Sequence, residues 1–323
     1  ALKPREASHL KPFFDWEETG EGFEPVGVRM EKKDWLIAGI IAAVYAAVAL
    51  VYLGATDTPQ SVWYAKTPGE SIIVDLGEQH ATAEEIMIFR GLGSSGAQML
   101  YESSADGESW YTLYQQTLSD KDDAEKPGDV FKWQSYKIYT DARYIRMTME
   151  IPSMRIAEIC FRDGEGNTLP ILSAVTEGQQ EEGNSPLLAF DEQNSAPAYP
   201  SFYNGTYFDE IYHARTAWEH INGVWPYEIS HPPLGKIIMG IGIRIFGMSP
   251  FGWRIMGTLF GVAMLPFLYA MGKALFRKRR YAAIASILMA VDFMHFTQTR
   301  IATIDVYAVF WILGMYYYML RYV

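Results

Sequence analysis

Two long apolar segments without a charged side chain constrain the fold of this chain most strongly. Residues 36–53 and 255–272 are each long enough to cross the ~30 Å hydrocarbon core of a bilayer as one helix. The shorter apolar runs at 281–291 and 306–320 reach that length only by including Asp292 and Asp305 or their flanks. The sequence therefore predicts a polytopic α-helical membrane protein. Its four expected spans are residues 35–53, 251–275, 281–297 and 301–321.

Basic residues at the ends of these segments predict the orientation. Lys32 and Lys33 precede the first span, Arg277 and its basic neighbours separate the second from the third, and Arg321 follows the fourth. Short basic flanks mark the cytoplasmic side of a membrane. Residues 1–34 are therefore expected to be a cytoplasmic tail, and the large acidic loop after the first span is expected to be extracytoplasmic. The chain is expected to be a multi-pass protein of the plasma (cell) membrane.

Residues 58–172 differ completely from the spans, because short alternating apolar and polar runs are separated there by Gly, Asp-Gly and Pro. Ile145 and Met147 alternate with Tyr144 and Arg146, for example. This pattern predicts an inserted extracytoplasmic antiparallel β-sandwich. Cys160 is the single cysteine and is expected to be a small core residue. The polar residues 173–200 are expected to be a linker.

Residues 201–250 form an aromatic-rich motif region, which we expect to lie at the outer membrane surface with surface helices. Asp209 and Glu210 are adjacent carboxylates there. Burial among aromatic side chains would make such a carboxylate a stronger base, although a solvated surface pair is the alternative. His231 and Lys236 flank two prolines, so a helix beginning near Leu234 would present its N-terminus to an anion. A rigid surface turn is the alternative there.

The predicted outer hairpin between the third and fourth spans is rich in ionisable residues. It contains Asp292, His295, Arg300 and Asp305, and such groups at membrane depth usually mark a functional path. Thr303 could cap the fourth helix. An Arg300 ion pair with Asp292 or Asp305 is the purely structural alternative. The three charged regions together suit a lipid-linked anionic substrate, with cations for a phosphate, a carboxylate for an acceptor and apolar walls for a lipid tail.

Two resemblances add to this interpretation, the first of them in the predicted sandwich. Residues 75–77 (DLG), 104–110 (SADGESW), 142–146 (ARYIR) and 158–166 (EICFRDGEG) resemble the discoidin or coagulation-factor C-type domain, a galactose-binding-like sandwich. The resemblance implies a glycan or lipid headgroup as ligand, and no catalytic residue. A spacer or docking domain without a ligand is the alternative.

The second resemblance covers residues from about 187 to 323. Residues 208–219 (FDEIYHARTAWE), 231–236 (HPPLGK), 246–254 (FGMSPFGWR) and 292–307 (DFMHFTQTRIATIDVY) resemble the protein O-mannosyltransferase family of GT-C membrane glycosyltransferases. The resemblance implies inverting transfer of a mannosyl group from a polyprenyl-phosphate carrier to Ser or Thr hydroxyls of proteins. It implies Asp209 as the base with Glu210 beside it, and His231 and Arg300 as phosphate contacts. Lys236 is a weaker phosphate assignment, and Asp292, His295 and Asp305 have supporting roles.

The expected partners follow from this resemblance: a lipid-linked sugar, a protein acceptor, membrane lipid and a possible glycan on the sandwich, but no nucleic acid. No cofactor is expected and no Cys/His metal motif is present in the sequence, while a divalent metal stays open. Family members usually have about a dozen spans, so the chain is expected to be the N-terminal portion of a bacterial-type enzyme. The alternatives are a GT-C enzyme acting on a lipid or cell-wall glycan, and a membrane-anchored glycan-binding or adhesion protein.

Overall fold

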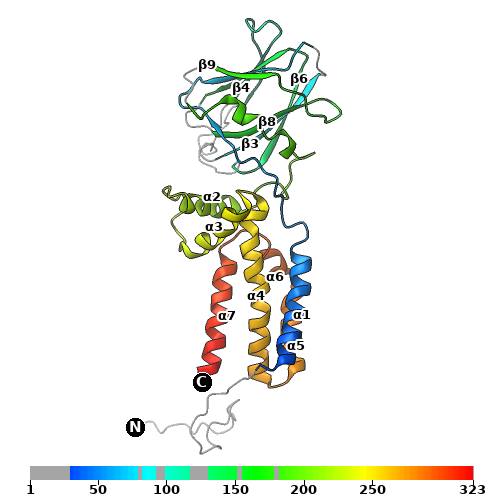
Figure 1. The fold of residues 1–323 in the computed structure, drawn as a ribbon, viewed down its shortest axis with the longest axis vertical. Helices are drawn as coiled ribbons and strands as arrows, with labels where there is room; N and C mark the ends of the chain where they lie inside the picture. Colours follow the sequence, from blue (N-terminus) through cyan, green and yellow to red (C-terminus); the bar gives the residue numbers. More distant parts are fainter. Residues whose placement is uncertain are drawn as a thin grey trace, which may run out of the picture.

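A computed structural model describes residues 30–78, 82–91, 99–116, 130–150, 155–177 and 182–322. Most of the predicted tail 1–34 lies outside these residues. Strands form the upper part of the molecule in Figure 1 and helices form the lower part, with further helices lying crosswise between them.

The upper part consists of two antiparallel sheets that share one hydrophobic core. The four-stranded sheet has the order β1–β8–β3–β6, and the five-stranded sheet has the order β5–β4–β7–β2–β9. The bounds of the first sheet are β1 (Trp63–Tyr64), β8 (Arg155–Arg162), β3 (Ala83–Arg90) and β6 (Trp133–Thr140). Those of the second are β5 (Tyr111–Gln116), β4 (Met99–Ser104), β7 (Tyr144–Met149), β2 (Ser71–Asp75) and β9 (Ser173–Glu177). We refer to strands β1 to β9 as the β-sandwich.

The period-two alternation of β7 explains how this core forms. Ile145 and Met147 are fully buried, whereas Tyr144 and Arg146 on the opposite face are only partly buried. Pairing of Ile72 with Met147 aligns the apolar face of β2 with that of β7. Ile86, Ile88 and Phe161 from the other sheet complete the core.

The predicted linker 173–200 is largely structured, which corrects that expectation. Its first residues form β9, which pairs with β2, and two short 3-10 helices follow, η1 (Pro186–Ala189) and η2 (Gln193–Ser195). The Arg162 guanidinium then donates hydrogen bonds to the carbonyls of Ala196, Pro197 and Ala198. Strand pairing between distant segments is invisible in local composition, which is why the polar composition of this segment predicts a linker.

The lower part consists of α1 (Lys32–Ala49), α4 (Pro250–Phe276), α5 (Arg279–Ala290) and α7 (Asp305–Tyr322), which lie side by side along the long axis (Figure 1). Among the described helices, α4 alone is both long and apolar enough to cross a membrane by length and composition. It begins where Ser249 caps the Gly252 amide at 3.1 Å with Pro250 in the first turn, and ends at Arg277 in the left-handed conformation.

The segment predicted as one span at 281–297 is divided in the structure. Helix α5 ends at Ala290, and the six-residue α6 (Phe293–Gln298) begins after it. The Asp292 carboxylate accepts a hydrogen bond from the His295 amide at 2.7 Å and so caps α6. An N-capping Asp starts a new helix, and this local preference overrides the continuous apolar pattern.

Helices α2 (Glu210–Ile221) and α3 (Leu234–Phe246) lie across the upper ends of the long helices, within the predicted motif region 201–250 (Figure 1). A second hydrophobic core joins them to the sandwich. Phe89 and Trp133 of the four-stranded sheet pack there with Ala214, Met239 and Trp253 of the helices. Cys160 belongs to this core, where it is buried and free. The sandwich is therefore packed onto the helical part rather than tethered to it.

Candidate functional site

Glu210, at the start of α2, is fully buried and lies at the centre of the site. The Arg254 guanidinium binds both of its oxygens, with Nε 2.7 Å from Oε1 and Nη2 2.5 Å from Oε2. The amides of Tyr207 and Ala302 each donate to this carboxylate at 2.8 Å. Such a bidentate, hydrogen-bonded pair holds its partners in one geometry. Glu210 therefore joins α2, α4 and the segment before α7.

Arg254 extends this connection to two further segments. Its Nη1 donates to the Leu53 carbonyl after α1 at 3.0 Å, and its Nη2 donates to the Gly205 carbonyl at 3.1 Å. Sequence reasoning missed Arg254, although it is an arginine directly before an uncharged apolar segment. An ionisable residue at such a position was the available signal.

Asp209 differs from its neighbour, because its carboxylate has no hydrogen-bond partner among the residues that the structure describes. It occupies the N-cap position of α2 without capping it through its side chain, and it is partly exposed. Its carbonyl accepts hydrogen bonds from the amides of Tyr212 and His213. The two adjacent carboxylates thus differ in environment. Glu210 is buried and paired with Arg254, whereas Asp209 is partly exposed and can interact with a ligand.

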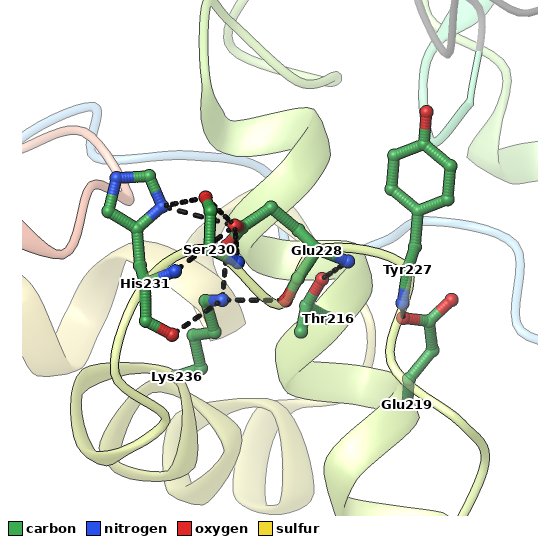
Figure 2. A network of polar contacts seen from close by, with 7 residues as sticks. All are labelled: Thr216, Glu219, Tyr227, Glu228, Ser230, His231 and Lys236. Atoms are coloured by element: carbon green, nitrogen blue, oxygen red, sulfur yellow. Dashed lines mark hydrogen bonds and ion pairs between the residues drawn. The ribbon is translucent and has the colours of Figure 1, made fainter.

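His231 and Lys236 meet at Glu228, as Figure 2 shows. The Lys236 side chain is buried, forms an ion pair with the Glu228 carboxylate and donates to the Glu228 carbonyl at 2.8 Å. The exposed His231 ring has Nδ1 3.2 Å from Glu228 Oε1 and 3.1 Å from Ser230 Oγ. Lys236 is therefore the buried partner of Glu228 and not a free cation. This geometry does not support the predicted contact between Lys236 and the donor phosphate.

Helix α2 holds the loop that carries this cluster. The Glu228 amide donates to Thr216 Oγ1 at 3.3 Å, and the Tyr227 amide donates to Glu219 Oε2 at 2.6 Å (Figure 2). Burial alone would raise the pKa of Glu228, but hydrogen bonds from Lys236 and its neighbours outweigh burial and lower the pKa to about 2. Glu228 is thus ionised at neutral pH, and sequence reasoning missed it.

His213, one helical turn after Asp209, contacts this cluster through His231. Its ring packs edge to face with the His231 ring at 5.6 Å between centroids. Burial lowers the pKa of His213, and the positive charge of Lys236 lowers it further. The His213 imidazole is therefore neutral at neutral pH.

Arg300 follows α6 and has a different kind of partner. Its guanidinium donates to the carbonyls of Ala49, Val51 and Tyr52 at 3.0, 2.6 and 3.0 Å, and it lies 4.8 Å from the Phe296 ring centroid. The Ala49 carbonyl is at the C-terminal end of α1, where the helix dipole is negative, and the other two directly follow that end. No ion pair joins Arg300 to Asp292 or Asp305 within the described ranges, so the structural alternative for this residue is not observed.

Arg300 and Arg254 line a pocket of about 910 Å³ between the end of α1, the segment before α2, and α6. Most of its other walls are aromatic or apolar. The aromatic lining residues are Tyr52, Tyr199, Phe202, Tyr203, Tyr207 and Phe293. The pocket thus combines a guanidinium that is not neutralised by a described carboxylate with walls suited to an apolar chain.

The remaining predicted residues have structural positions. Asp292 caps α6, and the buried His295 ring lies 5.2 Å from the Tyr45 ring. Asp305 is exposed in the first turn of α7, where a carboxylate is favourable. The expected cap from Thr303 is not observed, because its hydroxyl has no hydrogen-bond partner in the part of the chain that the structure describes.

Among the described residues, one group of carboxylates has spacing suited to a metal ion, and it lies between β8 of the sandwich and the segment around η2. Glu158, Asp191 and Glu192 offer oxygens within 4.8 Å of one another. The Gln60 and Ser61 amides already donate to Glu192 Oε2, and the Glu192 amide donates to Glu158 Oε2. These hydrogen bonds connect the sandwich to the segment after it, which gives the cluster a structural role.

Comparison with known proteins relates this geometry to a family. Residues 230–323 match the family model described as dolichyl-phosphate-mannose-protein mannosyltransferase. The chain is 31% identical over 115 residues to a polyprenol-phosphate-mannose–protein mannosyltransferase of Mycobacterium tuberculosis, covering 34% of this chain and 22% of that protein. A protein of the same description from Mycolicibacterium smegmatis is 33% identical over 108 residues, covering 32% and 21%.

A third relative of the same description, from Corynebacterium glutamicum, is 28% identical over 127 residues, covering 35% of this chain and 24% of the relative. The chain thus spans less than a quarter of each of these relatives. A solved structure, CBM32 of AlyQ in complex with 4,5-unsaturated mannuronic acid, is 25% identical and covers 33% of this chain and 79% of that one, with a TM-score of 0.26.

The matched residues contain the His231–Lys236 cluster, α4 with Arg254, and Arg300 with its hairpin. They therefore include most of the charged groups that meet at the upper ends of the long helices. Residues 230–323 are therefore similar to the dolichyl-phosphate-mannose-protein mannosyltransferase family and to these three bacterial relatives.

Proposed function

We propose that this chain forms part of a membrane glycosyltransferase that moves a mannosyl group from a polyprenyl-phosphate carrier to Ser or Thr hydroxyls of proteins at the outer membrane face. The proposal rests on one observation: some charged groups near Glu210 form ion pairs and others do not. Arg254 neutralises Glu210, whereas Asp209 and Arg300 have no described partner of opposite charge. In a reaction that expels a phosphate, an unpaired carboxylate can take the proton of the acceptor, and an unpaired guanidinium can stabilise the departing phosphate.

The chemistry assigns Asp209 to the acceptor hydroxyl. The hydroxyl oxygen forms a bond to the anomeric carbon while the bond from that carbon to the phosphate oxygen breaks. The hydroxyl proton passes to the Asp209 carboxylate, and the electron pair of the broken bond stays on the phosphate. Attack from the side opposite the phosphate inverts the anomeric configuration. The fixed Glu210–Arg254 pair supports this role by holding the backbone beside Asp209 in place.

Arg300 is assigned to the phosphate of the donor, with His231 as a second contact. Guanidinium groups bind phosphate oxygens through paired, charge-assisted hydrogen bonds. Stabilising the departing phosphate lowers the barrier to transfer. The aromatic walls of the 910 Å³ pocket beside Arg300 would accept the apolar chain next to the phosphate. The connection from Glu210 to the Ala302 amide supports a common site, because it ties the Asp209 segment to the Arg300 segment.

The proposed topology has four spans with the N-terminus in the cytoplasm. Besides α4, the spans are α1, the α5–α6 pair and α7. Large apolar side chains are exposed along these helices, as expected of a lipid-facing surface. Ile40 and Val44 of α1, Leu288 of α5 and Met315 of α7 are examples. The basic residues at the lower ends of α1 and α4 support a cytoplasmic position for those ends.

Arg300→Gln tests the donor assignment in membranes that contain the intact protein. With polyprenyl-phosphate mannose and a Ser/Thr peptide as substrates, we expect the KM of this variant for the donor to rise about 10- to 100-fold. This is the change expected when a hydrogen bond to a charged group is lost. Arg244→Gln is the matched control, because Arg244 also donates to a backbone carbonyl, that of Ile221. Hexose on the peptide is detected by mass spectrometry. An unchanged donor KM in Arg300→Gln would contradict the assignment.

A further inference from the structure

The segment that leads into Asp209 is held by the β-sandwich. The Thr206 amide donates to the Phe131 carbonyl at 3.1 Å, and Thr206 Oγ1 donates to the Val130 carbonyl at 3.0 Å in a buried contact. Val130 and Phe131 precede β6 of the four-stranded sheet. Asp209 is therefore three residues from a two-point attachment to another part of the molecule.

The attachment is closely packed as well as hydrogen-bonded. A Cβ atom on Gly205 would lie 2.6 Å from Lys132 Cβ and 3.0 Å from Lys132 Cα, so no larger residue fits without movement of the sandwich. On its other side, the Gly205 carbonyl accepts a hydrogen bond from Arg254. Gly205 and Thr206 thus lie between the sandwich and the Glu210–Arg254 pair.

Backbone strain is concentrated on both sides of this contact. Phe131 has a φ of 57° and Phe208, directly before Asp209, has a φ of 49°. Bulky side chains rarely adopt this left-handed conformation, which persists where surrounding contacts enforce it. The buried Phe131 ring lies 6.4 Å from the Trp253 ring, next to Arg254, so packing against the helices accompanies its strained backbone. Strain of this kind is typical of backbone that is held for function.

We propose that the β-sandwich is a positioning element of the transferase site, and that Thr206 is the positioning residue through which it sets the place of Asp209. This inference rests on the proposed function and adds a role for a domain outside the residues that match the family. The sandwich then acts on catalysis through Val130 and Phe131, whatever its strands bind elsewhere. A displacement of about 1 Å at a reacting group can lower a rate 100-fold.

Thr206→Val tests this inference, because it removes the hydroxyl donor and keeps the shape of the side chain. In the intact protein in membranes, we expect kcat to fall about 10- to 100-fold with the KM for polyprenyl-phosphate mannose unchanged. Thr206→Ser retains the donor and is expected to recover kcat relative to Thr206→Val. Thr176→Val on β9 is the matched control, because β9 belongs to the five-stranded sheet and not to the sheet that contains β6, and it is expected to keep wild-type kcat.

Hydrogen exchange of residues 201–209 gives a second readout, and we expect it to be faster in Thr206→Val. If Thr206→Val does not accumulate, Gly205→Ala takes its place, with the same selective fall in kcat expected. Wild-type kcat in the tested variant, or a loss in Thr206→Ser equal to that in Thr206→Val, would overturn the inference. Absence of transfer by the wild-type protein would instead overturn the proposed function, so the two failures are distinguishable.

Discussion

At the scale of single residues, the ionisable groups differ in whether another side chain neutralises them. Arg254 neutralises Glu210 and Lys236 neutralises Glu228, and both pairs are buried or nearly so. Asp209 and Arg300 have no such partner among the described residues. Removing one member of a buried pair leaves an unpaired charge, so these pairs are expected to matter for folding, whereas Asp209 and Arg300 are expected to matter for chemistry.

Glu158 of the sandwich gives a prediction for stability against pH. Burial raises its pKa to about 8, although hydrogen bonds from the Glu192 amide and Gln193 partly oppose this. A raised pKa means that the folded state favours the protonated acid. The stability that Glu158 contributes is therefore fully present below its ordinary pKa of 4.5 and is lost as the pH rises through 8.

We therefore expect the melting temperature of the wild-type protein to fall between about pH 5 and pH 8, and Glu158→Gln to reduce that fall. Thermal unfolding of the detergent-solubilised protein measures both slopes. Glu182→Gln, an exposed position, is the control and should keep the wild-type slope. Equal slopes in Glu158→Gln and the wild type would show that this carboxyl does not titrate as described.

At the scale of elements, small residues allow α4 to pack closely against the segment before α7. Gly257 and Gly261 are four residues apart on one face of α4, and a Cβ on Gly261 would lie 2.4 Å from Thr299 Cγ2. Close approach at small residues is a common basis of helix packing in membranes. This contact lies beside Arg300, so it supports the proposed phosphate site from below.

Gly261→Ala is expected to destabilise the protein by about 1–3 kcal/mol, because the added methyl group cannot be accommodated without movement of Thr299. Gly39→Ala on α1 provides the comparison, since nothing lies within 4 Å of a Cβ there. That change should be neutral or slightly stabilising, as expected for Gly to Ala in a helix. Thermal unfolding in detergent distinguishes the two variants, and equal melting temperatures would refute the packing argument.

Elements defined by long local patterns were predictable from the sequence, and those defined by distant partners were not. The expected span 251–275 corresponds to α4, because charge-free apolar length is a local property. The break at Asp292 and the strand β9 were missed, since a capping hydrogen bond and a pairing with β2 outweigh composition. Asp209 and Arg300 stood out as charges in apolar surroundings. Arg254 could not be recognised from sequence, because its partner Glu210 is distant in the chain. Glu228 could not be recognised either, because its ion pair with Lys236 depends on how the intervening loop folds.

At the scale of the whole molecule, the sandwich and the basic lower ends of α1 and α4 are at opposite ends of the long axis (Figure 1). The proposed topology places them on opposite sides of the membrane. Because Cys160 is the single cysteine and is buried, a Cys160→Ala background is suited to labelling tests of this topology. Two exposed positions serve as reporters, Tyr139 on β6 and Lys278 between α4 and α5.

In intact cells, a membrane-impermeant maleimide is expected to label Tyr139→Cys, whereas Lys278→Cys should react only after permeabilisation. The charge distribution gives the reason, since basic flanks are retained in the cytoplasm. Labelling of the two positions is compared on a gel. Reaction of Lys278→Cys in intact cells would reverse the proposed orientation.

The central claim is that Asp209 takes the proton of the acceptor hydroxyl, and Asp209→Asn tests it most directly. In membranes containing the intact protein, the amide cannot accept that proton, so we expect transfer of mannose from polyprenyl-phosphate mannose to Ser/Thr peptides to fall at least 100-fold. Protein level and melting temperature should stay at wild-type values, because the Asp209 carboxylate has no described partner to lose. Asp57→Asn, at an exposed position, should transfer normally. Wild-type transfer by Asp209→Asn would contradict the account.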